Sequence, residues 1–259
     1  MMKRVLLIGI VIATATFSGC YYYGPCLNGS GSVITEVREV EDFTGVSNTA
    51  SFDVFVTRAD KFSVEVIAQE NLVSIIETYV SGNTLIIKTQ NDACFKSDTP
   101  VEVHISMPAT ELLRLSGSGR VFADMVESLE VEISNSGSGY MEIDSVRADT
   151  YVVSNAGSGY IGTEGSYVSE LHVIQSGSGR ILLEGDVEVA EYSLNSSGRI
   201  DALDLLASDV DATNTGSGTI YLWAADLLDA TITGSGDIIY MGNPQVSTRI
   251  TGSGSVRSY

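Results

Sequence analysis

The stretch "NSGSGYMEI" (residues 135–143) decides the fold, because it is one copy of a unit that recurs along the chain. The triplet Gly-Ser-Gly begins at residues 117, 137, 157, 177, 216, 234 and 252, and Ser196-Ser197-Gly198 is an altered copy. Successive copies are separated by 20, 20, 20, 19, 20, 18 and 18 residues. Such a constant period is typical of stacked repeats, whereas a flexible linker keeps no fixed count.

The residues around the triplet form columns of like side chains. The second residue after each triplet is always aliphatic: Val121, Met141, Ile161, Ile181, Ile200, Ile220, Ile238 and Val256. The residue between it and the triplet is mostly polar or aromatic: Arg120, Tyr140, Tyr160, Arg180, Arg199, Thr219, Asp237 and Ser255. This alternation is typical of a strand with one buried face. Amides and hydroxyls recur in the two columns before the triplet, and we expect them to form hydrogen-bonded ladders between coils.

These columns predict an all-β fold, a parallel β-helix with coils of about 20 residues over residues 111–259. The glycines would permit either a sharp left-handed bend or a close approach of backbones where each coil turns. A phosphate-binding loop is excluded because no lysine follows any triplet. The calcium-binding nonapeptide repeat is excluded because its period is about nine residues.

The first part of the chain is less regular. Residues 1–19 have a basic start at Lys3 and Arg4, an apolar run and small residues at the end, as in an export signal. Cys20 follows directly, which predicts a lipid-modified first residue and a membrane anchor; simple secretion is the alternative. Residues 20–35 are expected to be a linker, and residues 36–110 a β-rich portion that covers one end of the β-helix.

Within this β-rich portion, three local features are expected. "ENLVSIIETYV" (residues 70–80) has the spacing of a short helix, or of a helix turn that leads into a hairpin. Residues 58–61 are expected to be the turn of a hairpin. Traces of the coil occur where Gly29-Ser30-Gly31 precedes Val33, and where Ala50-Ser51-Phe52 precedes Val54.

Charge and cysteine content narrow the function classes. With 14 basic and 33 acidic residues, the net charge of −19 argues against nucleic-acid binding. If Cys20 carries lipid, Cys26 and Cys94 remain to form a disulfide in an oxidising compartment, although the sequence does not show whether they approach each other. No cofactor is expected, and the two isolated histidines do not predict a metal site.

Two columns are candidates for binding. Tyrosine and arginine are frequent in binding hot spots, and tyrosine rings can stack on sugars, so one surface is proposed at Arg120, Tyr140, Tyr160, Arg180 and Arg199. The other column consists of the carboxylates Asp124, Asp144, Glu164 and Glu184. These are expected to be solvated side chains, with weak Ca²⁺ binding as the alternative. No catalytic residues are predicted, because coils of constant length leave no inserted loops to wall a cleft.

Three segments, residues 37–60, 70–89 and 107–121, resemble the head-domain GIN family of exported bacterial proteins, described as autotransporter adhesins. The resemblance covers roughly residues 36–259 and implies a right-handed parallel β-helix in the cell envelope, without an established activity. Ala50-Ser51-Phe52 departs from the glycine and serine that relatives keep at this turn.

The leading hypothesis is a lipid-anchored envelope protein, on either face of the outer membrane, that acts as an adhesin or binding scaffold for a glycan or protein. A self-associating structural component is the alternative, because the last turn, "TGSGSVRSY" (residues 251–259), shows no cap. A polysaccharide-active β-helix enzyme is a third hypothesis.

Overall fold

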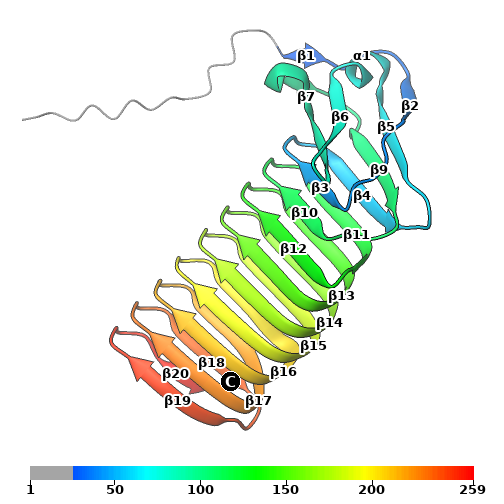
Figure 1. Cartoon of the computed structure of the whole chain (residues 1–259). Helices are drawn as coiled ribbons and strands as arrows, with labels where there is room; N and C mark the ends of the chain where they lie inside the picture. Colours follow the sequence, from blue (N-terminus) through cyan, green and yellow to red (C-terminus); the bar gives the residue numbers. More distant parts are fainter. Residues whose placement is uncertain (1–25) are drawn as a thin grey trace, which may run out of the picture.

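The structure is a computed structural model that describes residues 26–259. It confirms a nearly all-β fold, a solenoid of about seven turns with coils of roughly 20 residues. The solenoid is elongated, with a cap of shorter elements at its N-terminal end and the C-terminus at the opposite end (Figure 1).

Parallel strands, in register along the residues that follow each triplet, build the solenoid. Tyr140 of one coil pairs with Tyr160 of the next, and Ile161, Ile181 and Ile200 lie opposite one another in three successive coils. These three isoleucines are fully buried, which confirms the aliphatic column. Each contributes roughly 1.5–3 kcal/mol through burial. The strands are β10 (Leu112–Leu115), β11 (Arg120–Glu127), β12 (Glu130–Asn135), β13 (Tyr140–Asn155), β14 (Tyr160–Gln175), β15 (Arg180–Leu194), β16 (Arg199–Asn214), β17 (Thr219–Ile232), β18 (Asp237–Met241), β19 (Gln245–Ile250) and β20 (Val256–Ser258).

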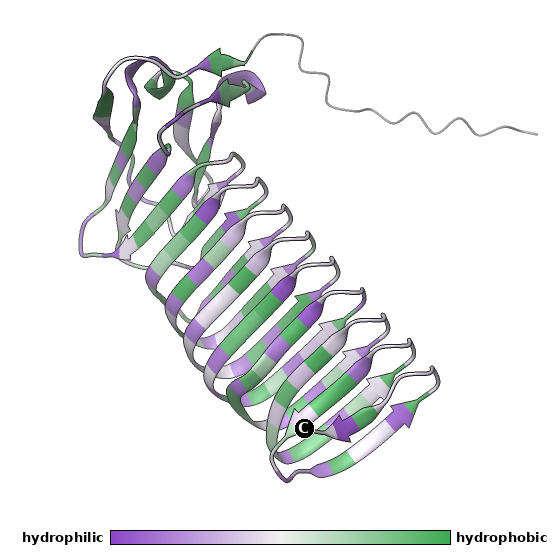
Figure 2. Cartoon of the chain, turned by 180° about the vertical axis from the view of Figure 1, so that it is seen from behind, coloured by the Kyte–Doolittle hydropathy of each residue, from purple (hydrophilic) through white to green (hydrophobic). Residues whose placement is uncertain are grey.

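Each long strand covers three faces of its coil. In β13 the buried residues alternate up to Ile143, the phase then shifts to Val146, and it shifts again to Tyr151. The chain therefore turns two corners between one Gly-Ser-Gly turn and the next. We call residues 140–143, 146–148 and 150–155, with their equivalents in other coils, the first, second and third faces. Figure 2 shows the resulting mixture of hydrophobic and hydrophilic residues along each strand.

The glycines of the triplets allow the backbones of successive turns to approach closely. Of the two roles expected from the sequence, close approach is therefore the one observed, and the left-handed bend is not. A Cβ at Gly157 would lie 1.8 Å from the carbonyl oxygen of Gly137, and a Cβ at Gly159 would lie 2.2 Å from that of Gly139. A side chain at either position would therefore separate successive turns. The positive φ angles among glycines are found elsewhere, for example at Gly185.

In the column directly before the triplet, one expected link between coils is present, since Oγ1 of Thr215 donates to Oδ1 of Asn195 at 2.8 Å. In the column two residues before the triplet, the amides do not form the expected ladder. Asn135 is buried, its Nδ2 donates to the carbonyl of Gly139 at 2.9 Å, and its Oδ1 accepts from the amide of Gly137 at 3.0 Å. Asn48 and Asn214 make the same pair of bonds in their own turns. The amides therefore bind turn backbone instead of one another, and they satisfy polar groups that the bend leaves unpaired.

The solenoid begins before residue 111, inside the portion expected to be a separate cap. β3 (Gly45–Asn48) pairs in parallel with β10, and β4 (Asp53–Arg58) pairs in parallel with β11. Beyond them, β7 (Thr84–Thr89) and β9 (Glu102–Met107) add one more parallel layer. Phe52, which replaces a glycine, is fully buried and packs against Phe95 at 5.6 Å between ring centroids. The side chain fits because the segment over this turn is the irregular connection between β7 and β9.

Antiparallel strands close the parallel stack. β5 (Ser63–Gln69) pairs with β9, and β6 (Ile76–Ser81) pairs with β7. The four-residue helix α1 (Glu70–Val73) joins β5 to β6 and buries Leu72 and Val73, so the helix turn leading into a hairpin is confirmed.

Two local expectations for the cap are wrong. Residues 58–61 do not close a hairpin, because β4 and β5 lie on opposite sides of β9. Val33 does not belong to a coil, because β2 (Val33–Arg38) pairs antiparallel with β5 and Val33 is 49% exposed. Strand pairing across the cap overrides both local patterns.

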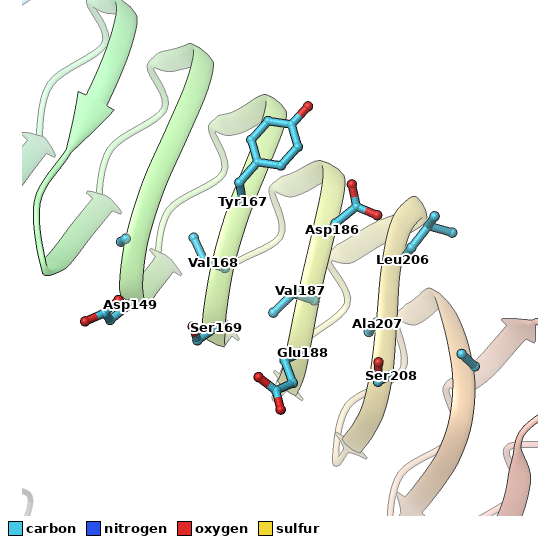
Figure 3. A pocket seen from close by; sticks show the side chains of 12 residues that line it. Asp149, Tyr167, Val168, Ser169, Asp186, Val187, Glu188, Leu206, Ala207 and Ser208 are labelled. Carbon is cyan, nitrogen blue, oxygen red and sulfur yellow. The ribbon is translucent and has the colours of Figure 1, made fainter.

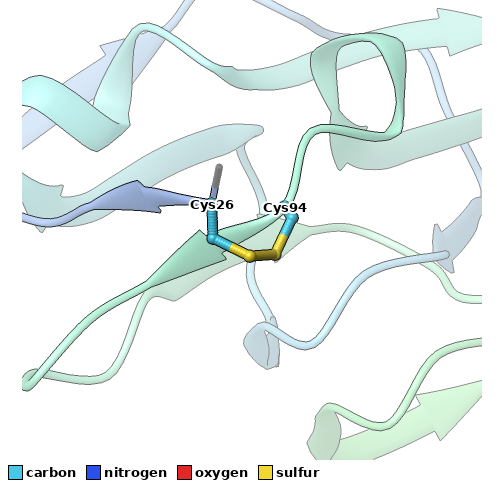
Figure 4. Close-up of a disulfide and its surroundings, with 2 residues drawn as sticks. All are labelled: Cys26 and Cys94. Carbon is cyan, nitrogen blue, oxygen red and sulfur yellow. A yellow bond between two sulfur atoms is a disulfide. The ribbon is translucent and has the colours of Figure 1, made fainter. Parts of the chain in front are cut away.

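A disulfide joins Cys26 to Cys94 (Figure 4). It lies beside the short parallel pair β1 (Leu27–Asn28) and β8 (Phe95–Lys96), so the expected linker 20–35 contains strand structure. The helical turn η1 (Gln90–Asp92) precedes Cys94. The bond holds the start of the described chain to the cap. The expected export signal (residues 1–19) and Cys20 lie outside the described residues. In residues 26–259, no helix has the length and apolar character that crossing a membrane requires.

Candidate functional site

A shallow groove of about 430 Å³ runs along the first face, beside the turns. Three residues from each of four successive coils line it: the serine and second glycine of the triplet, and the first residue of the next strand. We call it the turn groove. It brings together four of the five residues of the proposed binding column, namely Tyr140, Tyr160, Arg180 and Arg199, and leaves Arg120 outside its lining.

The two tyrosines are held against each other and against the sheet. Their rings stack with centroids 4.7 Å apart and planes 15° apart. The Tyr160 ring lies over Gly162, where an added Cβ would be 2.8 Å from Cε1 of the ring. The Tyr140 hydroxyl donates to Oε2 of Glu142 at 2.7 Å. Both rings therefore have fixed orientations before any ligand binds.

The surroundings of the tyrosines keep their hydroxyls protonated. Burial, together with the hydrogen bond to Glu142, raises the pKa of Tyr140 to about 12. Burial also raises the pKa of Tyr160, and the positive charge of Arg180 partly opposes this rise. Near neutral pH both side chains are neutral hydrogen-bonding groups with an aromatic ring.

The two arginines converge on one carboxylate. Nη2 of Arg180 lies 2.7 Å from Oδ2 of Asp201, and Nη2 of Arg199 lies 2.6 Å from the same oxygen. Asp201 is only 7% exposed, although it is on the outward side of its strand, and the guanidinium of Arg199 lies 4.1 Å from the centroid of the Tyr221 ring. Arg120 differs, because it binds Asp53 through two hydrogen bonds in a pair of its own.

Sequence reasoning missed the residues that support this groove. Phe55 and Phe122 stack at 5.3 Å, and Phe122 lies 6.1 Å from Tyr140, so the aromatic row extends toward the cap. Asp201 was also missed. The repeat period itself could have found them, since Phe122 and Asp201 each stand two residues after an arginine of the binding column.

The carboxylates Asp124, Asp144, Glu164 and Glu184 lie near the corner between the first and second faces. Asp124 Oδ1 accepts hydrogen bonds from the amides of Arg58 and Met125. A bulge shifts the register so that Glu184 lies opposite Asp204, a residue that a constant period does not place in this column. Among residues 26–259, no three acidic, histidine or cysteine side chains converge as a metal site would require.

A larger groove of about 640 Å³ lies on the second face (Figure 3). Its floor contains the buried Val168 and Val187, and its rim carries the exposed Tyr167 and Leu206. Three carboxylates, from Asp149, Asp186 and Glu188, surround it, and its lining contains no basic residue. By volume alone, the second-face groove would be the preferred candidate for a binding site. The turn groove is preferred here, because its fixed aromatic rings and cationic donors can bind a ligand.

Comparison with known proteins agrees with the fold. The profile of the family described as "Putative auto-transporter adhesin, head GIN domain" matches residues 42–181 and 166–244. The chain belongs to this family. No curated protein matches significantly.

Several solved structures share the architecture of this family member. A "putative lipid binding protein" from Parabacteroides distasonis is 28% identical, with a TM-score of 0.84. A "putative adhesin" from the same species is 23% identical, with a TM-score of 0.85, and another from Parabacteroides merdae is 22% identical, with a TM-score of 0.79. Each alignment covers 91% of this chain and 100% of the other. The latter two likenesses concern the fold alone.

Proposed function

We propose that this protein is a non-catalytic adhesin of the cell envelope that binds a glycan along the turn groove. The observation that carries the proposal is the stacked pair Tyr140 and Tyr160 beside a row of serine hydroxyls. Flat aromatic rings offer apolar contact to a sugar face, and hydroxyls and guanidinium groups offer hydrogen bonds to its edge. The family's description as adhesin-like supports this reading.

The proposal includes an anchor at Cys20 in the outer membrane. Cys20 is six residues before Cys26, which is fixed to the cap by the disulfide. Six residues span at most roughly 20 Å, so lipidation at Cys20 would hold the cap near the membrane. The coils that carry the turn groove begin β13 to β16, which are farther along the solenoid from the cap, so the groove would lie away from the membrane surface (Figure 1).

A glycan array tests the binding function, with Tyr140→Ala/Tyr160→Ala as the test variant. Tyr167→Ala is the matched control, because Tyr167 is 55% exposed in the second-face groove. Stacking on each ring is worth about 0.5–1.5 kcal/mol, so the double variant is expected to bind at least about fivefold more weakly. The control is expected to bind like the wild type.

Two results would contradict the proposal. One is a wild-type protein that binds no glycan on the array, and the other is equal binding by the double variant. A protein that bound no glycan but assembled with rising concentration would favour the self-associating structural component instead. Metabolic labelling with a palmitate analogue, compared between wild type and Cys20→Ser, tests the anchor separately.

A further inference from the structure

The charges in the turn groove are unbalanced. Arg180 and Arg199 share the single carboxylate of Asp201, so this trio carries a formal charge of +1 in a chain whose net charge is −19. The contrast with Arg120, which has Asp53 to itself, shows that the imbalance belongs to this part of the column. A local cationic centre on a strongly acidic protein favours an anionic ligand.

The two guanidinium groups also keep donors free for a ligand. A guanidinium has five N–H donors, and Arg180 and Arg199 each direct one nitrogen to Asp201. Their side chains are 47% and 45% exposed. The Tyr221 ring and the shared carboxylate hold Arg199 in place, which lowers the entropy lost when it binds a ligand.

The cationic centre is next to the aromatic pair along the groove. Tyr160 and Arg180 are register partners in adjacent coils, and Arg199 follows in the next coil. Adjacent coils are separated by about 4.8 Å. The hydroxyls of Ser178 and Ser197, 3.5 Å apart, line the groove beside the two arginines. A ligand along the axis therefore meets two tyrosines, then two arginines with serines beside them.

We propose that the glycan bound here carries an isolated acidic group, a carboxylate or a sulfate, that binds Arg180 and Arg199. This inference rests on the proposed glycan-binding function. The neutral sugar next to the acidic group stacks on the tyrosine pair. A densely charged polyanion is disfavoured, because the negative charges of Glu142, Glu164 and Glu184 act on Tyr160. At physiological salt, charges closer together than roughly 8 Å are only weakly screened.

The test compares neutral oligosaccharides with their sialylated and sulfated derivatives on one array, followed by calorimetry on the strongest pairs. The acidic member of a pair is expected to bind about tenfold more tightly than its neutral parent, since hydrogen bonds between charged partners are the stronger class. The sialylated and sulfated arms distinguish a carboxylate from a sulfate. Raising the ionic strength is expected to reduce the acidic preference.

Arg180→Gln and Arg199→Gln are the test variants, and each leaves Asp201 one arginine partner, so the buried carboxylate stays neutralised in both. Arg114→Gln is the control: it removes the same charge from the third face, where Arg114 pairs with the exposed Glu132. Each test variant is expected to lose most of the acidic preference, so that the acidic and neutral members of a pair bind with similar affinity. The control is expected to keep the preference.

The outcomes separate this inference from the function on which it rests. Equal binding of acidic and neutral members by the wild type overturns the acidic ligand and leaves glycan binding intact. An acidic preference that survives both arginine variants also overturns it. Absence of binding to every glycan overturns the inference together with the proposed function.

Discussion

Replacing Gly157 by alanine tests whether the triplet glycines are required for close packing of successive turns. The new Cβ would lie 1.8 Å from the carbonyl oxygen of Gly137, whereas ordinary contact begins near 3.4 Å. Reaching that distance would break the bonds from the Gly157 amide to Asn135, now 3.4 Å, and from the Gly159 amide to Gly137, now 3.3 Å.

The expected cost follows from these contacts. Each lost backbone hydrogen bond costs about 1 kcal/mol, and overpacking adds about 1–3 kcal/mol. Alanine also lowers the conformational entropy of the unfolded chain, which stabilises the folded protein by about 0.5 kcal/mol. We therefore expect Gly157→Ala to lower the free energy of unfolding by about 2.5–4.5 kcal/mol, measured by urea denaturation followed by circular dichroism.

Gly165→Ala is the matched control in the same coil. Its Cβ would lie 3.3 Å from the nearest atom, the carbonyl oxygen of Asp144, and its φ is not in the left-handed region. The free energy of unfolding is expected to change by less than about 1 kcal/mol. Equal unfolding midpoints for the two variants would refute the close-approach explanation.

Three further outcomes are expected. Reducing the Cys26–Cys94 bond, whose cysteines are 68 residues apart, is expected to destabilise the cap by roughly 4 kcal/mol, and unchanged urea denaturation under reducing conditions would contradict this. The pKa of Tyr140 is about 12 in the folded protein and about 10 in the unfolded chain. Its contribution to the free energy of unfolding is therefore complete below pH 10 and is lost as the pH rises toward 12. Absorbance titration of Glu142→Gln is expected to show a lower pKa for Tyr140, identified by difference from Tyr140→Phe; an unchanged value would argue against the hydrogen bond.

The repeat was predictable from sequence because each coil has the same local pattern of residues. An inward aliphatic residue, an outward polar residue and a glycine-bounded turn recur at constant spacing, so the columns at Ile161 and Tyr160 follow from counting. The upstream turn at Ala50-Ser51-Phe52 was also found by its neighbours Asn48 and Val54, despite the missing glycines.

The features that the repeat period did not predict depend on interactions between segments that are distant in the sequence. The bulge that places Glu184 opposite Asp204 arises where coil lengths differ by one residue, and a fixed period hides it. The placement of β2 depends on pairing with β5, and that of β5 on pairing with β9, which no local pattern contains. The sharing of Asp201 between Arg180 and Arg199 requires side-chain directions as well as register.

Hydrogen exchange with and without a bound glycan tests the location of the binding site most directly. On binding, we expect slower exchange in the segments that line the turn groove, namely residues 138–140, 158–160, 178–180 and 197–199, and unchanged exchange elsewhere. Slower exchange confined to residues 167–169, 186–188 and 206–208, which line the second-face groove, would contradict this assignment.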